Sequence, residues 1–306
     1  MLRSGAHLTA TARESTSTSA ARSRAVHWVL IGAQVCFGSL PVAGRMALGR
    51  IPPNAIVITR LTAGAIGFWI WAHLLGTTRI ARRDWPAIAG LALLGVVGNQ
   101  LLFMNGLVRS TATNAAVLGS TIPVFTALFA IALRREVVRG ARLAGIAVAL
   151  IGALVLAGAD GLSTSPEHLA GSGMILANSA CYGLYLVLAR PLAQRYSPIL
   201  LTAAIFTVGT IVVAPLGVIG WADAPPLEVG DLAFLAFLIA VPTLGAYSLT
   251  QIGLRRAEAS LVASYIYLQP LVTAIGAVIL LGERPGLDTA IAAAFIFGGV
   301  LLSTRA

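Results

Sequence analysis

The sequence contains no lysine, only two cysteines and few charged residues. All 21 basic residues are arginine, which excludes a glycine-rich phosphate loop that ends in lysine. Cys36 and Cys181 both lie in apolar stretches and offer neither a disulfide framework nor a set of metal ligands. We interpret them as small packing residues and expect no cofactor or metal.

Acidic residues are absent from the middle of the apolar segments, although the chain has 11 of them. The sequence also lacks a His-Glu-x-x-His motif and a pair of aspartates within one apolar region. A membrane-embedded enzyme would need such a constellation, so an enzyme is the less favoured class.

Apolar residues dominate the chain. They make up 58 % of it, only 10 % of residues are charged, and the mean hydropathy is +0.88. A soluble protein of 306 residues needs far more polar surface. Most apolar segments approach the ~20 residues that a helix needs to cross a bilayer. We therefore predict an all-α integral membrane protein with ten transmembrane helices, at about 27–47, 55–75, 86–107, 113–133, 140–158, 171–189, 199–219, 230–252, 259–281 and 287–303.

The net charge of +10 is unevenly distributed along the chain. If the N-terminus is cytoplasmic, most arginines fall on the cytoplasmic side of the ten segments, as the positive-inside rule requires. The basic charge therefore reflects membrane topology, with both termini cytoplasmic, and not a nucleic-acid partner. Residues 1–26 are rich in Ser, Thr, Ala and Arg. We favour a disordered cytoplasmic tail for them over a transit peptide.

An internal repeat divides the chain into two halves, 27–158 and 171–303. The first spans of the halves align at an offset of 145, and later segments at an offset of 147. Five spans per half is an odd number, so the second half enters the membrane from the opposite side. Inverted repeats of this kind are typical of secondary transporters, because they supply two near-equivalent conformations. The repeated residues include Gly38, Pro123 and Thr126, which return as Gly183, Pro270 and Thr273.

Several motifs resemble those of the EamA family in the drug/metabolite transporter superfamily. They are Arg60 after Pro-Pro-Asn, the segment from Gly119-Ser-Thr-Ile-Pro123 to Arg135-Glu136, and Tyr267-Leu-Gln-Pro270 followed by Gly282-Glu283. The resemblance implies export of amino acids or other small metabolites across the bacterial inner membrane by alternating access. Export of drugs or lipid-linked sugars is the alternative within the same fold.

Polar side chains inside the predicted spans are candidates for the substrate site. Such groups are costly in hydrocarbon and usually face the interior of a bundle. We expect them to line a central cavity for a small solute, although hydrogen bonds between helices would explain any single one equally well. The candidates are Gln34, Asn99, Gln100, Asn178, Tyr182, Tyr247, Gln251, Tyr265 and Gln269.

Pro123 and Pro270 lie midway along spans four and nine, where each removes a backbone donor. A pair of hinges and a pair of static kinks explain them equally well. Glu136 and Glu283 stand near the starts of spans five and ten. They either couple transport to protons or, as we prefer, interact with helix dipoles. Uniport is accordingly our preferred mode.

Arg60 is the one basic residue inside a span. Its side chain could reach the headgroups or pair with another helix, and we favour these over an inward position that attracts a carboxylate. Spans five and ten carry glycines and little polarity, so we expect them at the periphery. There they could contact each other or a second copy in a homodimer.

Overall fold

The computed structural model describes residues 25–77, 79–135, 140–159 and 166–282, together with positions 286, 287, 290, 291, 294, 295, 298, 299 and 302. Within these residues the chain forms helices and the turns that join them, and no strand. Eight helices are long and apolar enough to cross a bilayer, which confirms an all-α, multi-pass membrane protein. They are Ala25–Ala47, Pro53–Leu74, Arg82–Val108, Ala112–Ala132, Leu169–Arg195, Pro198–Ala222, Val229–Arg256 and Ala259–Leu281.

The two remaining predicted spans differ from these eight. Segment 140–158 is a helix, but its described apolar stretch, Leu143–Gly152, is shorter. Segment 287–303 lies largely outside the described residues, as do Glu136, Glu283 and most of the predicted tail.

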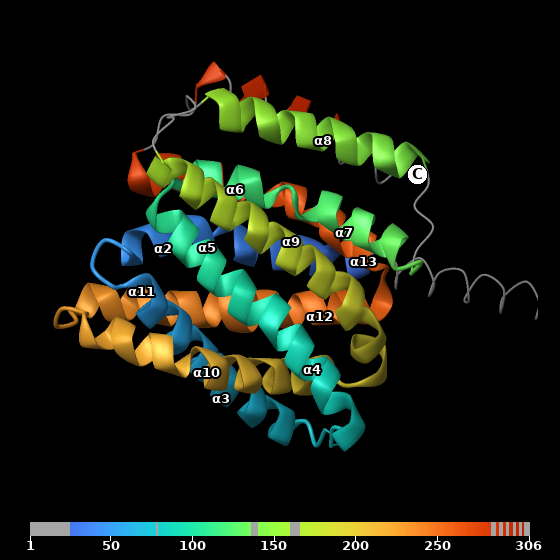
Figure 1. Ribbon diagram of the computed structural model, residues 1–306, viewed down its shortest axis with the longest axis vertical. Helices are drawn as coiled ribbons and strands as arrows, with labels where there is room; N and C mark the ends of the chain where they lie inside the picture. The colour runs from blue at the N-terminus through green and yellow to red at the C-terminus, as the bar shows by residue number, and fades with distance from the viewer. Residues whose placement is uncertain are drawn as a thin grey trace, which may run out of the picture.

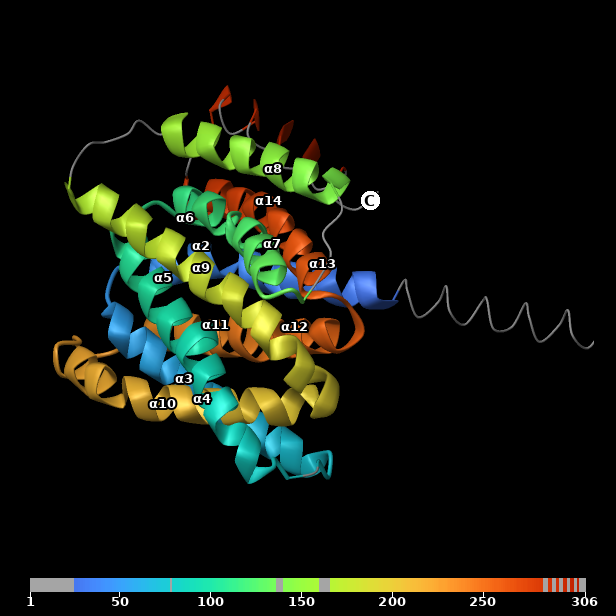
Figure 2. The same cartoon turned by 45° about the vertical axis from the view of Figure 1, so that its right-hand side comes forward.

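The first half contains a helix over residues 25–38, then α2 (Leu40–Ala47), α3 (Pro53–Leu74), α4 (Trp85–Ala92), α5 (Asn99–Val108), α6 (Ala112–Gly119), α7 (Ile122–Ala132) and α8 (Gly140–Ala159). The second half contains α9 (Pro166–Arg195), α10 (Pro198–Ala222), α11 (Val229–Ile239), α12 (Ala246–Arg256), α13 (Ala259–Ser264) and α14 (Gln269–Gly276). Figure 1 shows them packed as one bundle, with α8 at one edge beside α6 and α7. Figure 2 confirms the peripheral position of α8.

Two π-helical segments interrupt equivalent spans. One is η2 (Leu93–Gly98), between α4 and α5, and the other is η3 (Ala240–Gly245), between α11 and α12. They stand 147 positions apart, the offset of the sequence repeat. Pro242 cannot donate a backbone hydrogen bond, and the Thr243 hydroxyl donates to the Leu238 carbonyl at 2.7 Å. A π-segment often marks a functional region of a helix.

A second pair of interruptions occurs beside the two predicted prolines. A turn at Ser120–Thr121 separates α6 from α7, and a 3₁₀ segment, Tyr265–Leu268, separates α13 from α14. Each proline then stands in the first turn of a new helix, where a missing N–H costs little. The Thr121 hydroxyl donates to the Leu118 carbonyl at 2.7 Å. The duplicated prolines therefore start helices at broken points of their spans.

Helices α3 and α10 form the most extensive helix pair of the described residues. Glycines permit their close approach, because a Cβ at Gly64 would lie 2.6 Å from Phe206 of α10 and a Cβ at Gly217 would lie 2.3 Å from Ile58 of α3. A Cβ at Gly209 would make an ordinary contact with Leu61, at 3.7 Å, and would crowd Val96, at 2.7 Å. In the repeat, Gly64 corresponds to Gly209 and Leu61 corresponds to Phe206. The contact of Gly64 with Phe206 therefore has a counterpart in the contact of Gly209 with Leu61, with the two halves exchanged.

Three further contacts also recur with the halves exchanged. In two of these pairs of contacts an added Cβ would lie 2.6–2.9 Å from the partner side chain, so those glycines again serve close packing, whereas at Gly98 and Gly245 it would make an ordinary contact with a cysteine sulfur, at 3.4 and 3.5 Å. Cys36 and Cys181 take part, in agreement with a packing role. The exchanged contacts are Gly38 with Val272 and Gly183 with Phe125, Gly98 with Cys181 and Gly245 with Cys36, and Gly106 with Ile175 and Gly253 with Leu30.

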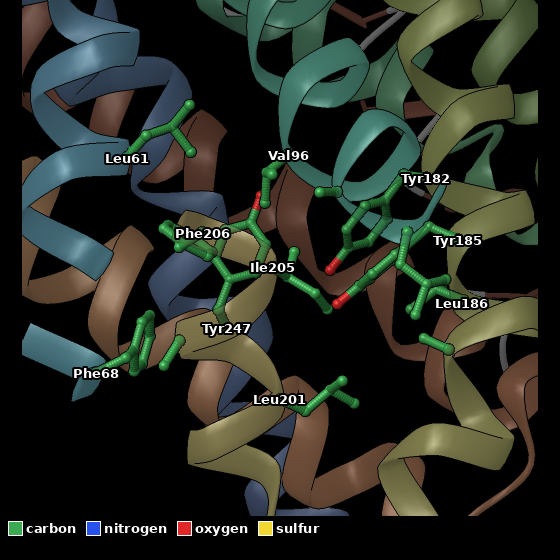
Figure 3. Close-up of a cluster of buried hydrophobic side chains, with 14 of the residues drawn as sticks. Leu61, Phe68, Val96, Tyr182, Tyr185, Leu186, Leu201, Ile205, Phe206 and Tyr247 are labelled. Atoms are coloured by element: carbon green, nitrogen blue, oxygen red, sulfur yellow. The ribbon is translucent and has the colours of Figure 1, made fainter. Parts of the chain in front are cut away.

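The exchanged packing surrounds one large apolar core. Phe206 contacts Phe68 and Tyr247 edge to face, with ring centroids 5.3 and 4.9 Å apart. Tyr182 and Tyr185 stack on the other side of the same cluster. Figure 3 shows this cluster at the meeting of helices from both halves.

We predict that Gly64→Ala lowers the free energy of unfolding by about 1–3 kcal/mol, because the added methyl overlaps the buried Phe206 ring. The matched control is Gly90→Ala in α4, where a Cβ meets nothing within 4 Å. It should be neutral or slightly stabilising, since alanine favours helix. Thermal unfolding of both variants in detergent measures the difference. Equal melting temperatures would contradict the close crossing.

Candidate functional site

A small cavity lies where the two halves meet. Its volume is about 50 Å³, which holds a few water molecules but not a whole metabolite. Its polar wall is formed by one guanidinium, four amides and two phenols, on Arg60, Asn99, Gln100, Asn178, Gln269, Tyr182 and Tyr247. Its apolar wall includes Phe37, Leu40, Pro41, Phe103 and Ile122.

Six of the nine predicted substrate-site residues lie in this wall, and three do not. Gln34 lies behind the cavity wall, where its Oε1 accepts a hydrogen bond of 2.7 Å from Nε2 of the wall residue Gln269. Gln251 is fully buried and donates to the Tyr185 hydroxyl at 2.6 Å. Tyr265 forms a hydrogen bond with His27 instead. These three side chains form hydrogen bonds between helices, which was the alternative explanation for each polar residue.

The two π-segments deliver polar residues to the cavity. Asn99 and Gln100 are the first residues of α5 after η2, and Tyr247 is the second residue of α12 after η3. The Tyr247 hydroxyl lies 3.2 Å from both the Gly95 carbonyl oxygen and Asn99 Oδ1. The equivalent interruptions of the two halves thus meet across the cavity through one tyrosine.

Helix α9 and the end of the first helix complete the wall. Asn178 Nδ2 donates to the Asn99 carbonyl at 2.7 Å, which fixes the amide beside the η2 segment. Phe37 packs edge to face against Tyr182 and Tyr247, with ring centroids 6.1 and 5.3 Å away. An apolar aromatic surface therefore stands next to the amides.

Arg60 does not reach the headgroups, so the snorkelling interpretation is wrong. Its residue is only 1 % exposed, and it forms part of the cavity wall. Nε donates to the Thr243 hydroxyl at 2.9 Å, so pairing between helices holds for that nitrogen. Nη1 and Nη2 are buried, and no group in the described residues accepts a hydrogen bond from them. The reason for the inward position is Thr243, which is 183 positions away in sequence.

Both predicted hinge positions adjoin the cavity. Gly119 and Ile122, on either side of the α6–α7 turn, line it, and so does Gln269, which precedes Pro270. The broken points of the two spans therefore lie in the cavity wall, and a hinge role for the prolines stays a prediction.

Two ion pairs join the halves at opposite ends of α3 and α10. Arg50 precedes α3 and contacts Asp231 at 3.1 Å and Glu228 at 2.9 Å, just after α10. Arg195 precedes α10 and contacts Asp84 at 3.0 Å, after α3. Each N-terminus therefore lies beside the C-terminus of the other helix, and α3 and α10 run antiparallel.

The repeat relates the two ion pairs to each other. Arg50 and Arg195 differ by 145 positions, and Asp84 and Asp231 by 147. Asp84 also accepts a hydrogen bond from the Tyr196 hydroxyl. The cavity thus lies between two equivalent charged contacts, one at each end of the bundle.

Comparison with known proteins decides the family. The sequence profile of the EamA-like transporter family matches residues 24–158 and again 169–305. This chain belongs to the EamA-like transporter family. It is therefore a membrane transporter and not an enzyme, as the sequence predicted.

Individual relatives of this EamA-like transporter cover almost its whole length. A probable terminal-alkyne amino-acid exporter of Streptantibioticus cattleyicolor is 31 % identical over 91 % of this chain and 93 % of its own. The aromatic amino acid exporter YddG of Ancylobacter novellus is 25 % identical over 84 % of this chain and 89 % of its own. A solved crystal structure superposes with a TM-score of 0.76 at 22 % identity, over 92 % of this chain and 97 % of that one, and supports the fold.

Sequence reasoning missed three features of this EamA-like transporter. Phe37 and Phe103 carry no polar signal, and an apolar residue in a span faces lipid or protein equally well. Thr243 carries no distinct signal, because a threonine in a helix commonly bonds its own backbone. The two ion pairs, in contrast, could have been found, because Arg50 and Asp84 both recur in the second half.

We predict that Asn178→Ala reduces transport at least about tenfold, because it removes an amide from the cavity wall together with a buried hydrogen bond. Ser264→Ala is the control, since among the described residues this buried hydroxyl bonds within its own helix, to the Ser260 carbonyl at 2.7 Å, and lies outside the wall. Initial rates in proteoliposomes, normalised to the folded protein, make the comparison. An unchanged rate for Asn178→Ala would remove that residue from the site.

Proposed function

We propose that this EamA-like transporter exports an amino acid with an apolar side group. The observation that carries the proposal is the cavity at the meeting of the halves, whose wall combines amides, phenols and a guanidinium with aromatic faces. Such a wall suits a zwitterion with a modest apolar side group, since convergent polar groups orient a ligand and apolar ones surround it. Two relatives bear the names of amino-acid exporters, which supports the same substrate class.

The proposed architecture is ten spans in two inverted halves, with both termini cytoplasmic in the bacterial inner membrane. The antiparallel pair α3 and α10 supports the inversion, as do the glycine contacts that recur with the halves exchanged. The arginine distribution supports the orientation. On this topology the Arg50–Asp231 pair faces outward, and the Arg195–Asp84 pair faces the cytoplasm.

The proposed mechanism is alternating access, in which the two ion pairs open in turn. Each pair joins a half-exposed arginine to a largely buried carboxylate, since the side chains of Arg50 and Asp231 are 43 and 6 % exposed and those of Arg195 and Asp84 are 45 and 14 % exposed. Water reaches the arginines, so each contact can break in a cycle, at a cost above the ~0.2–1 kcal/mol of a fully exposed pair. With both pairs formed the cavity is too small for an amino acid. Binding a substrate therefore requires one end to separate.

The alternative substrates, drugs and lipid-linked sugars, receive no specific support from this compact cavity. Uniport stays our proposal for the mode of transport, and a homodimer stays a prediction. Uniport predicts that accumulation persists when only the pH gradient is removed.

The test of function is counterflow in proteoliposomes that contain the purified protein and one unlabelled amino acid. Uptake of the labelled form of a small or aromatic amino acid, above that of empty liposomes, is the expected result. Labelled nucleosides and a labelled hexose provide the comparison. Counterflow of those solutes without any amino acid would contradict the proposed substrate class.

We predict opposite effects for Asp84→Asn and Arg50→Gln. Asp84→Asn removes the ion pair with Arg195, and Arg50→Gln removes the ion pairs with both Glu228 and Asp231, so each should shift the population by about fivefold or more toward a conformation open at its own end. Single cysteines near each end, probed with a membrane-impermeant maleimide from either side, report the opening. The exchange Arg195→Asp with Asp84→Arg is the control and should restore the original labelling. If both substitutions open the same side, the two pairs are not alternating gates.

A further inference from the structure

Arg60 is a buried cation whose fork of donors is only partly used. Nε donates to Thr243, and the Thr243 hydroxyl donates onward to the Leu238 carbonyl. These two bonds fix the orientation of the guanidinium. Nη1 and Nη2 remain buried without an acceptor among the described residues, in a side chain that lines the cavity. Arginine stays protonated in proteins, so a positive charge is held there.

Holding this charge inside a membrane protein is costly when no acid accompanies it. The described ion pairs all lie at the ends of the bundle and involve other arginines. The cavity wall around Arg60 consists of neutral amides, phenols and apolar groups. The guanidinium therefore lacks a partner in this compact state, and an anion reaches Nη1 and Nη2 only when one end of the bundle separates.

The internal repeat allows the surroundings of Arg60 to be compared with the equivalent position in the other half. Arg60 and its partner Thr243 correspond to Ile205 and Val96. Both of these are buried, at 1 and 0 % exposure, in one apolar cluster, and Figure 3 labels them in it. At the equivalent position of the other half, two apolar side chains, Ile205 and Val96, are therefore sufficient for packing. The polar pair of Arg60 and Thr243 is not required by the fold, which indicates a role toward a ligand.

A planar fork with two free donor nitrogens matches a carboxylate, which accepts two parallel hydrogen bonds. The remaining wall suits the rest of an amino acid. The amide oxygens of Asn99 and Gln100 are acceptors for an ammonium group, and Phe37 and Tyr182 present aromatic surface to an apolar side group. A phosphate would also match the fork, so phosphate belongs in the test as a competitor.

We propose that Arg60 anchors the carboxylate of the transported solute, with Thr243 as the positioning residue that orients its guanidinium. The proposal rests on the proposed function and specifies which group of the substrate is recognised. Amino acids should therefore be substrates, whereas the corresponding amino amides should compete poorly. Both carry the same ammonium and side group, and only the amino acid carries the negative charge.

The test compares the full-length protein with a double variant that combines Arg60→Ile and Thr243→Val. This variant gives the first crossing the same apolar pair as Ile205 and Val96, so it should fold with an unchanged or higher melting temperature. We expect its half-saturation concentration for an amino acid to rise at least about 10- to 100-fold, because a charge-assisted contact is lost. Arg60→Lys should fall between the two, since it keeps the charge but loses the fork.

Counterflow is measured with phenylalanine, phenylalaninamide, 3-phenylpropionate and inorganic phosphate as unlabelled competitors. Strong competition by the two carboxylates and weak competition by the amide, both removed in the double variant, is the expected result. Equal competition by the amide, equal transport by the folded double variant, or strong competition by phosphate alone overturns the anchor.

These outcomes separate this proposal from the proposed function. Amino-acid transport that persists in the double variant leaves the amino-acid exporter standing and removes Arg60 as its anchor. Transport of 3-phenylpropionate without amino acids, dependent on Arg60, supports the anchor and contradicts the substrate class. No counterflow of any carboxylate by the original protein overturns both.

Discussion

The close antiparallel crossing of α3 and α10 is the constraint on which the other features depend. Gly64 in α3 and Gly217 in α10 allow the two helices to approach each other closely. That approach places Arg60 within hydrogen-bond distance of Thr243 and surrounds the cavity with residues of both halves. It also brings Arg50 to Asp231 at one end and Arg195 to Asp84 at the other. A pivot in the middle with similar contacts at both ends suits a rocking motion of two halves.

Asymmetry between the halves gives the cavity its chemistry. The packing glycines, the π-segments and the ion pairs recur, whereas the groups that line the cavity differ between copies. Arg60 stands against Ile205, Gln100 against Tyr247, and Ile122 against Gln269. The duplicated residues therefore support the frame and its movement, and the unmatched ones distinguish one solute from another.

Much of this organisation could be predicted from the sequence, because a polar group without a hydrogen-bond partner is energetically costly in hydrocarbon. That rule located the spans and placed Asn99, Asn178 and Tyr247 toward the interior. It could not separate the cavity from its surroundings, because Gln251 and Tyr265 obey the same rule while bonding to other side chains. The direction of Arg60 depended on a threonine far away in sequence, and the π-segments leave no periodicity to detect.

Distances across the two ends of the bundle test the pivot at the α3–α10 crossing most directly. Spin labels at positions 49 and 229 span the end held by Arg50, and labels at positions 82 and 194 span the end held by Arg195; all four residues are exposed. We expect an amino acid to redistribute the populations in opposite senses, so that one distance lengthens as the other shortens. Two distances that lengthen together, or neither changing while the protein transports, would contradict a pivot at the α3–α10 crossing.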